Sequence, residues 1–235
     1  MRIRFKPPSL KLLSLFISNA AVYASAACYY CFVQIYLSKT HSEVAVGSLL
    51  SVGQIIAVFA PVIWGIFADK SKYKNTVLCI ASAGYIISYY LVMVSDSYLY
   101  LAIVISFVMF FLSSFGGLID TITIEYAYKN DYKYGTIRVF GTIAYGIVAF
   151  GLAILIEKDI NMIFHINAAL SLLTCVFILT APKIKGHAHV EHAHKDKENT
   201  GVSAGERQKK FSLKPIFADN TLVWMMILQG VAQFT

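Results

Sequence analysis

The sequence predicts an all-α, polytopic membrane protein, and three observations carry that prediction. Hydrophobic residues make up 57% of the 235-residue chain and charged residues only 14%, whereas a soluble domain usually carries about 25% charged residues. The apolar residues are grouped into long blocks, and six of them approach or exceed the roughly 20 residues that a membrane-spanning helix needs. Lysines and arginines gather in alternate gaps between the blocks, as expected of a membrane protein with a fixed orientation.

Each block is predicted to be one helical span because it is long and nearly free of formal charge. The six blocks cover residues 12–37, 44–68, 76–95, 98–124, 137–156 and 161–181. Their formally charged residues are Asp120 in the fourth block and Arg138 in the fifth. A seventh block, 221–235, would rise only about 22 Å as a helix, which is short of a full span. We therefore expect a fragment that holds six spans and most of a seventh.

The positive charge predicts the orientation in the membrane. The gaps 1–11, 69–75, 125–138 and 182–220 hold 18 of the 20 lysines and arginines, and the other gaps hold Lys39 and Lys158. The positive-inside rule then places the N-terminus and the segment 182–220 in the cytoplasm, in a protein of the cytoplasmic membrane. The net charge of +7 reflects this topology, and nucleic acid is not an expected partner.

Three regions follow from this pattern. They are a six-helix transmembrane bundle (1–181), a flexible cytoplasmic linker (182–220) and the start of a seventh helix (221–235). The gap 125–135 is expected to be a polar cytoplasmic hairpin. Six helices, a long linker and further helices are typical of two-half transporters whose halves contain 3+3 inverted repeats. The bilayer and a C-terminal half of the same protein are therefore expected partners.

Asp120 and Arg138 are candidates for a functional pair. They lie nine residues before and nine residues after Lys129, so a turn centred there would put both at similar depth, roughly 13 Å from the turn. A lone charge in a span costs roughly 2.5–3.5 kcal/mol on insertion scales, and pairing would offset much of that cost. The residues alone leave two interpretations open: a solute-binding pair, or a hairpin lock in which Arg138 snorkels to the cytoplasm.

Polar and small residues also recur at helical spacing in four of the blocks. The stripes are Asn19, Tyr23, Tyr30 and Gln34; Gly47, Ser51, Gln54, Pro61 and Gly65; Ser106, Ser113, Gly117 and Asp120; and Arg138, Thr142, Tyr145 and Ala149. Each stripe alone is typical of contacts between membrane helices. Together they predict a water-filled cavity, with Asn19, Tyr23, Tyr30, Gln34 and Gln54 as candidate solute ligands. Tyrosines suit sugar or aromatic solutes because they offer a ring face and a hydroxyl.

The segment "GIFADKSKYK" (65–74) resembles the loop signature of the major facilitator superfamily, G-x-x-x-D-[RK]-x-G-[RK]-[RK]. Gly65, Asp69, Lys70 and Lys74 match it, and Lys72 stands where the second glycine is usual. The resemblance implies a gate between the two halves. We expect Gly65 to allow close approach of helices and Asp69 to lie near a helix N-terminus.

The segment "YGTIRVFGTIAYG" (134–146) is similar to the start of helix 5 in lactose permease and phenylpropionate-permease-like transporters. The matching residues are Tyr134, Gly135, Arg138, Phe140 and Gly141. The resemblance implies that Asp120 and Arg138 bind the solute and that Tyr145 stacks against it. Asp and Tyr here replace the Glu and Trp of lactose permease, which leaves the identity of the solute open.

These observations predict a secondary transporter that takes up a small polar organic solute, such as a sugar, an aromatic acid or a nucleoside, together with protons. A proton-driven exporter, a metal-ion carrier and a non-transporting scaffold or sensor are the alternatives. Nothing resembles a catalytic constellation, so the chain is predicted not to be an enzyme and to need no cofactor.

Histidines and cysteines supply the remaining candidates. The weak metal candidates form the cluster "HAHVEHAH", namely His187, His189, His192 and His194, although a solvated linker is the favoured interpretation. His165 is expected to be a satisfied membrane histidine. The four cysteines, Cys28, Cys31, Cys79 and Cys175, are expected to be small apolar packing residues.

Overall fold

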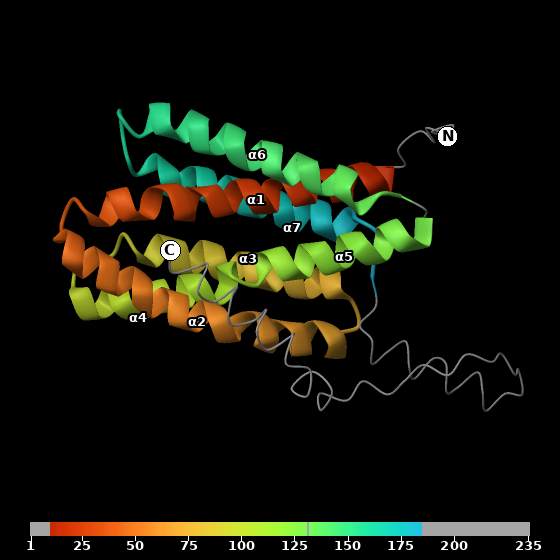
Figure 1. Ribbon diagram of the computed structural model, residues 1–235, viewed down its shortest axis with the longest axis horizontal. Helices are drawn as coiled ribbons and strands as arrows, with labels where there is room; N and C mark the ends of the chain where they lie inside the picture. Colours follow the sequence, from red (N-terminus) through yellow and green to blue (C-terminus); the bar gives the residue numbers. More distant parts are fainter. Residues whose placement is uncertain (1–9, 131, 185–235) are drawn as a thin grey trace, which may run out of the picture. The chain divides into compact units, whose positions relative to one another are not determined.

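The computed structural model describes residues 10–130 and 132–184, and these fold into helices joined by short turns (Figure 1). The helices are α1 (Leu10–Leu37), α2 (Glu43–Lys70), α3 (Lys74–Leu91), α4 (Tyr98–Leu112), α5 (Phe115–Asn130), α6 (Tyr134–Leu155) and α7 (Met162–Thr180). Because α4 and α5 are separated only by residues 113 and 114, they form the two parts of one span, the fourth of six. The predicted linker beyond residue 184, its histidine cluster and the seventh helix lie outside the described residues.

Five of the spans are long and apolar enough to cross a membrane, namely α1, α2, α4 with α5, α6 and α7. The third, α3, has 18 residues but does not reach the same hydropathy among the described residues. It packs against α4, α5 and α7, so its polar side chains face protein and not lipid. Tyr85 and Tyr89 show how this works: both are fully buried, and their hydroxyls donate to the carbonyls of Ser25 and Cys28 on α1 at 3.4 and 3.0 Å.

The packing of the helices shows the predicted 3+3 repeat. The main contacts are α1 with α6 and α7, α2 with α4, and α3 with α4 and α7. The first three spans are α1, α2 and α3, and the last three are α4 with α5, α6 and α7. If α1 is exchanged with α4, α2 with α6 and α3 with α7, the α1–α6 contact becomes α4–α2 and the α1–α7 contact becomes α4–α3. The α3–α7 contact is unchanged. Spans three apart in an up-and-down bundle run in opposite directions, so the two repeats are inverted. The structure thus confirms the predicted fold class.

The predicted polar hairpin at 125–135 is wrong in its extent. Helix α5 continues to Asn130 and α6 begins at Tyr134, so only residues 131–133 connect them. Apolarity marks where a span leaves the hydrocarbon and not where its helix ends. Within this extension Glu125 pairs with Lys74 of α3, and the Asn130 side chain donates to the Tyr126 carbonyl in the last turn.

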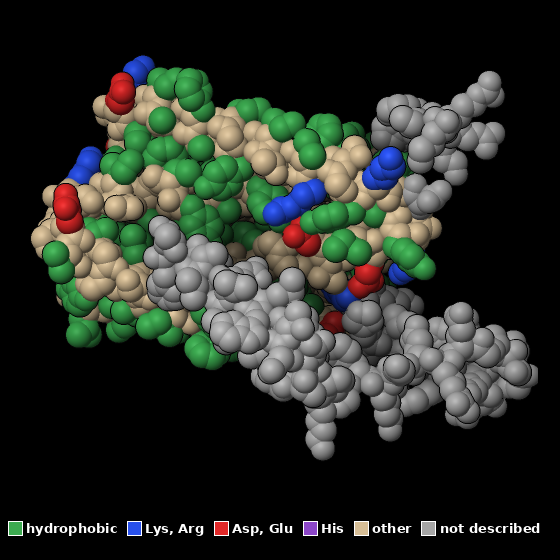
Figure 2. Space-filling model, in the orientation of Figure 1, with side chains coloured by type: hydrophobic (Ala, Val, Ile, Leu, Met, Phe, Trp, Pro, Cys, Tyr) green, Lys and Arg blue, Asp and Glu red, His purple; other side chains and the backbone are tan. Residues whose placement is uncertain are grey.

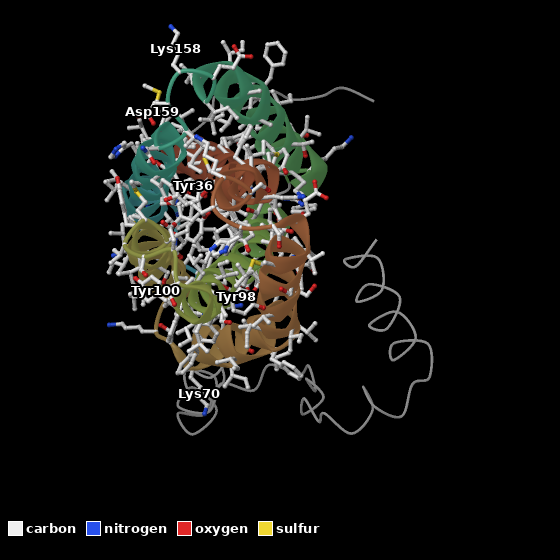
Figure 3. All side chains as sticks on the ribbon, turned by 90° about the vertical axis from the view of Figure 1, so that its left-hand side faces the viewer. Tyr36, Lys70, Tyr98, Tyr100, Lys158 and Asp159 are labelled. Carbon is white, nitrogen blue, oxygen red and sulfur yellow. The ribbon has the colours of Figure 1, made fainter. Side chains whose placement is uncertain are left out.

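The ends of the bundle differ from its middle. Charged side chains are seen toward both ends on the face in Figure 2, and green hydrophobic side chains lie among tan atoms over the visible stretch between them. The end-on view of Figure 3 shows Tyr36, Tyr98 and Tyr100 at the end where α1 finishes and α4 begins. The Tyr100 hydroxyl donates to the Leu91 carbonyl at 2.9 Å. Tyrosines at a span end are typical of the membrane–water interface.

Candidate functional site

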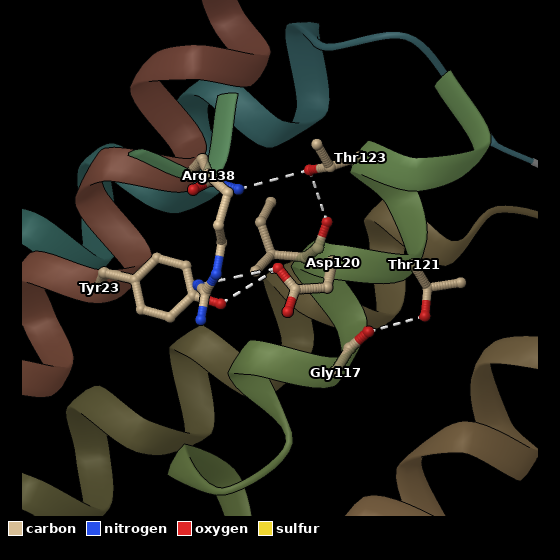
Figure 4. Close-up of polar contacts among 8 residues, drawn as sticks. Tyr23, Gly117, Asp120, Thr121, Thr123 and Arg138 are labelled. Atoms are coloured by element: carbon tan, nitrogen blue, oxygen red, sulfur yellow. Dashed lines mark hydrogen bonds and ion pairs between the residues drawn. The ribbon is translucent and has the colours of Figure 1, made fainter. Parts of the chain in front are cut away.

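Asp120, Arg138 and Tyr23 form one cluster between α1, α5 and α6 (Figure 4). Arg138 Nη1 lies 3.7 Å from Asp120 Oδ1. The Tyr23 hydroxyl donates to the same carboxylate oxygen at 3.1 Å, and Arg138 Cζ lies 3.8 Å from the centre of the Tyr23 ring. One tyrosine therefore contacts both charges, the anion through its hydroxyl and the cation through its ring face. The predicted pairing of Asp120 with Arg138 is confirmed.

A close approach of α1 and α6 places Arg138 over the ring of Tyr23. A Cβ atom at Gly141 would lie 2.4 Å from Tyr23 Cδ2 and 2.6 Å from Asn19 Oδ1, closer than atoms can pack. Only glycine therefore allows α6 to sit this near α1. Phe16 and Phe140 pack edge to face beside it, with ring centres 4.9 Å apart. Sequence analysis found Gly141 as part of a motif but not the neighbours that require it.

Asn19 joins the two helices that carry Tyr23 and Asp120. It is fully buried, and its Nδ2 donates to Thr123 Oγ1 at 3.4 Å, which links α1 to α5 one turn beyond Asp120. The Thr123 hydroxyl donates in turn to the Ile119 carbonyl at 2.7 Å. In this conformation Asn19 does not line an open surface, so its predicted contact with a solute stays a prediction. Thr123 was missed because a threonine in a span carries no distinguishing signal.

The ion pair is open and incompletely bonded. The side chains of Arg138 and Asp120 are 36% and 27% exposed. The separation of 3.7 Å is longer than a hydrogen bond, and Arg138 Nη1, although itself buried, has no hydrogen-bond partner within the described residues. A guanidinium has five N–H donors. Arg138 therefore keeps donors that could turn to a carboxylate, carbonyl or hydroxyl of a solute.

Tyr145 lies two turns from Arg138 on α6, about 10 Å along the helix. Its hydroxyl lies 3.3 Å from Cys31 Sγ on α1. Tyr30, half exposed at 49%, and the exposed Gln34 lie on the same end of α1. Gln54 is half-buried on α2, and no contact joins it to Asp120. The structure thus brings Tyr23 to the charged pair and places Tyr145, Tyr30 and Gln34 farther along.

The four residues predicted to form a gate do not lie in one loop, because three of them belong to α2 and the fourth begins α3. Helix α2 continues through Asp69 to Lys70, so Asp69 lies in the last turn of a helix. The expectation that it lies near the N-terminus of a helix concerns a neighbouring helix and stays a prediction. A Cβ at Gly65 would meet nothing within 4 Å, so no close approach depends on that glycine among the described residues. The gating role of both residues stays a prediction.

Among the predicted gate residues, Lys74 differs most from an ordinary solvent-exposed basic residue. Its side chain is 1% exposed and forms a direct ion pair with Glu125 of α5. Its backbone N–H donates to the Ile184 carbonyl at 2.9 Å. The neighbouring Asn75 donates to the carbonyls of Ile178 and Pro182 at 2.9 and 3.2 Å and accepts from the Ile184 N–H at 3.1 Å. The first residues of the predicted flexible linker, 182–184, are therefore bound to the start of α3.

The remaining candidates are simpler. The Tyr90 hydroxyl lies 2.9 Å from His165 Nδ1, which confirms that His165 is a satisfied histidine. The four cysteines are free thiols. No group of three or more His, Cys, Asp or Glu residues that could hold a metal occurs in the part of the chain that the structure describes. The cluster of His187, His189, His192 and His194 is outside that part.

Comparisons with known proteins agree with the fold. The uncharacterized transporter YwbF of Bacillus subtilis (strain 168) is 26% identical over 160 residues, which cover 66% of this chain and 39% of that protein. The crystal structure of the nucleoside transporter NupG is similar with a TM-score of 0.66 and 26% identity, over 77% of this chain and 46% of that one. A mutant of NupG gives a TM-score of 0.69 at 24% identity, over 82% and 52%.

The chain thus spans about half, or less, of the length of the relatives that it matches. The MFS_1 like family matches residues 12–235, nearly the whole sequence. These comparisons do not distinguish the lactose permease and phenylpropionate permease-like group from other groups. Together with the inverted repeat of six spans, they show that the chain belongs to the MFS_1 like family.

Proposed function

We propose that the protein takes up a small polar organic solute together with protons, and that a nucleoside is the first solute to test. One observation carries the proposal: the Arg138 guanidinium lies over Tyr23, 3.7 Å from Asp120, in a side chain that is 36% exposed and whose Nη1 has no hydrogen-bond partner within the described residues. Hydroxyl and carbonyl oxygens accept from such donors. The similarity to a nucleoside transporter supports the choice of a nucleoside over a sugar or an aromatic acid.

The proposed mechanism is alternating access. In transporters built from two repeat-containing halves, the solute site lies near the middle of the membrane, and the halves rock around it. Asp120 and Arg138 would supply one wall of that site, and the C-terminal half of the same protein would supply the other. The solute favours the closed state between the two openings because it contacts both walls there. Gly65, Asp69, Lys70 and Lys74 would stabilise one opening of the gate.

Uptake of radiolabelled uridine tests the proposal. The full-length protein is reconstituted in proteoliposomes with an acidic exterior and an alkaline interior. We expect accumulation that a protonophore abolishes, because a proton symporter moves solute with the inward proton gradient. Asp120→Asn should lose uptake because it removes the charge that holds Arg138. Asp96→Asn, in the exposed turn between α3 and α4, is the matched control and should retain it.

Each outcome has a defined meaning. An Asp120→Asn variant that folds and transports at the normal rate would contradict the solute-binding role of the pair. Accumulation of a galactoside or a hydroxyphenyl acid, but not uridine, would keep the site and change the solute class. Uridine efflux driven by the opposite gradient would replace uptake with export.

A further inference from the structure

The two cysteines of "CYYC" (28–31) have different surroundings. Cys28 is fully buried, and its Sγ lies 3.7 Å from the Ala24 carbonyl of its own helix. Cys31 is half-buried, and its Sγ lies 3.3 Å from the Tyr145 hydroxyl on α6. Cys28 is therefore a packing residue, as the sequence predicts. Cys31 instead makes a side-chain contact between the two helices that carry Tyr23 and Arg138.

The contact restrains the hydroxyl end of the Tyr145 ring. Tyr145 is half-buried, and among the described residues Cys31 is the one hydrogen-bond partner of its hydroxyl. A tyrosine hydroxyl can donate and accept, and a thiol is a weak donor and a weak acceptor. The bond is therefore strong enough to favour one ring orientation. It is also weak enough for the hydroxyl to exchange sulfur for an oxygen of a solute.

We propose that Cys31 is a positioning residue of the solute site, which holds the Tyr145 hydroxyl toward α1 until a solute oxygen replaces the sulfur. This inference rests on the proposed function, because it takes Tyr145 as part of the solute path. Recognition then has two points on α6, the Arg138 guanidinium and the Tyr145 hydroxyl, separated by two helical turns. A solute with polar groups at both of its ends satisfies both points.

The first test needs no solute. Cys28, Cys79 and Cys175 are replaced by serine, and Cys31 is labelled with N-ethylmaleimide. The sulfur adds to the maleimide double bond, and its proton goes to the neighbouring carbon. We expect Tyr145→Phe to raise the labelling rate several-fold, because the ring loses its bond to sulfur and uncovers it. Tyr36→Phe, five residues along α1, is the control and should leave the rate unchanged. An unchanged rate in Tyr145→Phe would overturn the proposal.

The second test measures uridine uptake. The bond to sulfur exists only before the solute binds, so its loss removes a competitor for the Tyr145 hydroxyl. Cys31→Ala should therefore lower KM, by at most the about 3- to 10-fold that one hydrogen bond of ordinary strength represents, with little change in the maximal rate. Cys28→Ala should change neither. A Cys31→Ala variant with a normal KM would reject the positioning role. If the unmodified protein transports no uridine, the nucleoside proposal fails, whereas the labelling test still decides whether Cys31 holds Tyr145.

Discussion

Two ion pairs link α5 to its neighbours, and they are built in opposite ways. In the pair of Lys74 and Glu125, the closed pair, the side chains are 1% and 23% exposed and in direct contact. In the pair of Arg138 and Asp120, the open pair, they are 36% and 27% exposed and 3.7 Å apart. Next to Lys74 of the closed pair, Asn75 makes three further hydrogen bonds to the end of α7 and the residues after it.

The difference distinguishes a charge that stabilises the bundle from a charge that can bind a solute. An ammonium that is buried and in direct contact with a carboxylate is out of reach of a solute, and the bonds around it fix the start of α3 against α5 and α7. A guanidinium that is a third exposed, stacked on a ring and beyond hydrogen-bond distance from its carboxylate can exchange partners. We infer that the closed pair stabilises the bundle and that the open pair is kept for binding.

Breaking the closed pair should have the largest effect. Removing one partner of a buried ion pair typically costs about 3–5 kcal/mol, because the other charge stays buried and unpaired. Since Glu125 retains some exposure, we expect Lys74→Met to lower the free energy of unfolding by about 3 kcal/mol, the low end of that range. Thermal unfolding in detergent measures the loss.

The double variant sharpens this test. Lys74→Met combined with Glu125→Gln removes both charges and keeps a hydrogen-bonding side chain at 125, so it should recover much of the lost stability. A double variant as unstable as Lys74→Met alone would show that Lys74 acts through packing and not through its charge.

Arg138→Lys should do the reverse of Lys74→Met, with a large effect on transport and a small one on folding. Lysine keeps the charge but loses the planar fork that bonds two atoms at once. A hydrogen bond to a charged group contributes about 1.5–3 kcal/mol, so we expect uridine uptake to fall about 10- to 100-fold. Normal uptake with reduced thermal stability would favour the hairpin-lock interpretation of this pair.

The sequence predicted most of the fold, because membrane spans are marked by length and apolarity. It also predicted the open pair, because charges are rare inside spans and the spacing of Asp120 and Arg138 around a turn limits where they can meet. It did not predict the closed pair. Glu125 and Lys74 lie among other charged residues near the ends of their helices, where nothing in a local pattern distinguishes a buried charge from a solvated one. Asn75 was missed for the same reason.

Gly141→Ala should have an intermediate effect by moving the elements that hold the open pair. A Cβ at 2.4 Å from Tyr23 Cδ2 forces α6 away from α1, and such overpacking typically costs about 1–3 kcal/mol. Both thermal stability and uridine uptake should fall. The control is Gly146→Ala on the same helix, where a Cβ meets nothing within 4 Å. That variant should be neutral or gain about 0.5–1 kcal/mol from the better helix former, and equal effects at the two glycines would contradict this account.

Tyr23→Phe should have the smallest effect, and it examines how the open pair stays open. Phenylalanine keeps the ring beneath the guanidinium and removes only the hydroxyl that donates to Asp120. One such bond contributes about 0.5–1.5 kcal/mol, so KM for uridine should rise about 3- to 10-fold while stability changes little.

A double variant that combines Tyr23→Phe with Arg138→Lys then decides whether Tyr23 and Arg138 act through the one carboxylate of Asp120. If the Tyr23 hydroxyl holds Asp120 for Arg138, the two losses overlap, and the double variant is less impaired than the sum of the single effects predicts. Fully additive losses would mean that Tyr23 contacts the solute independently. In that case the open pair owes its geometry to the ring and the backbone alone.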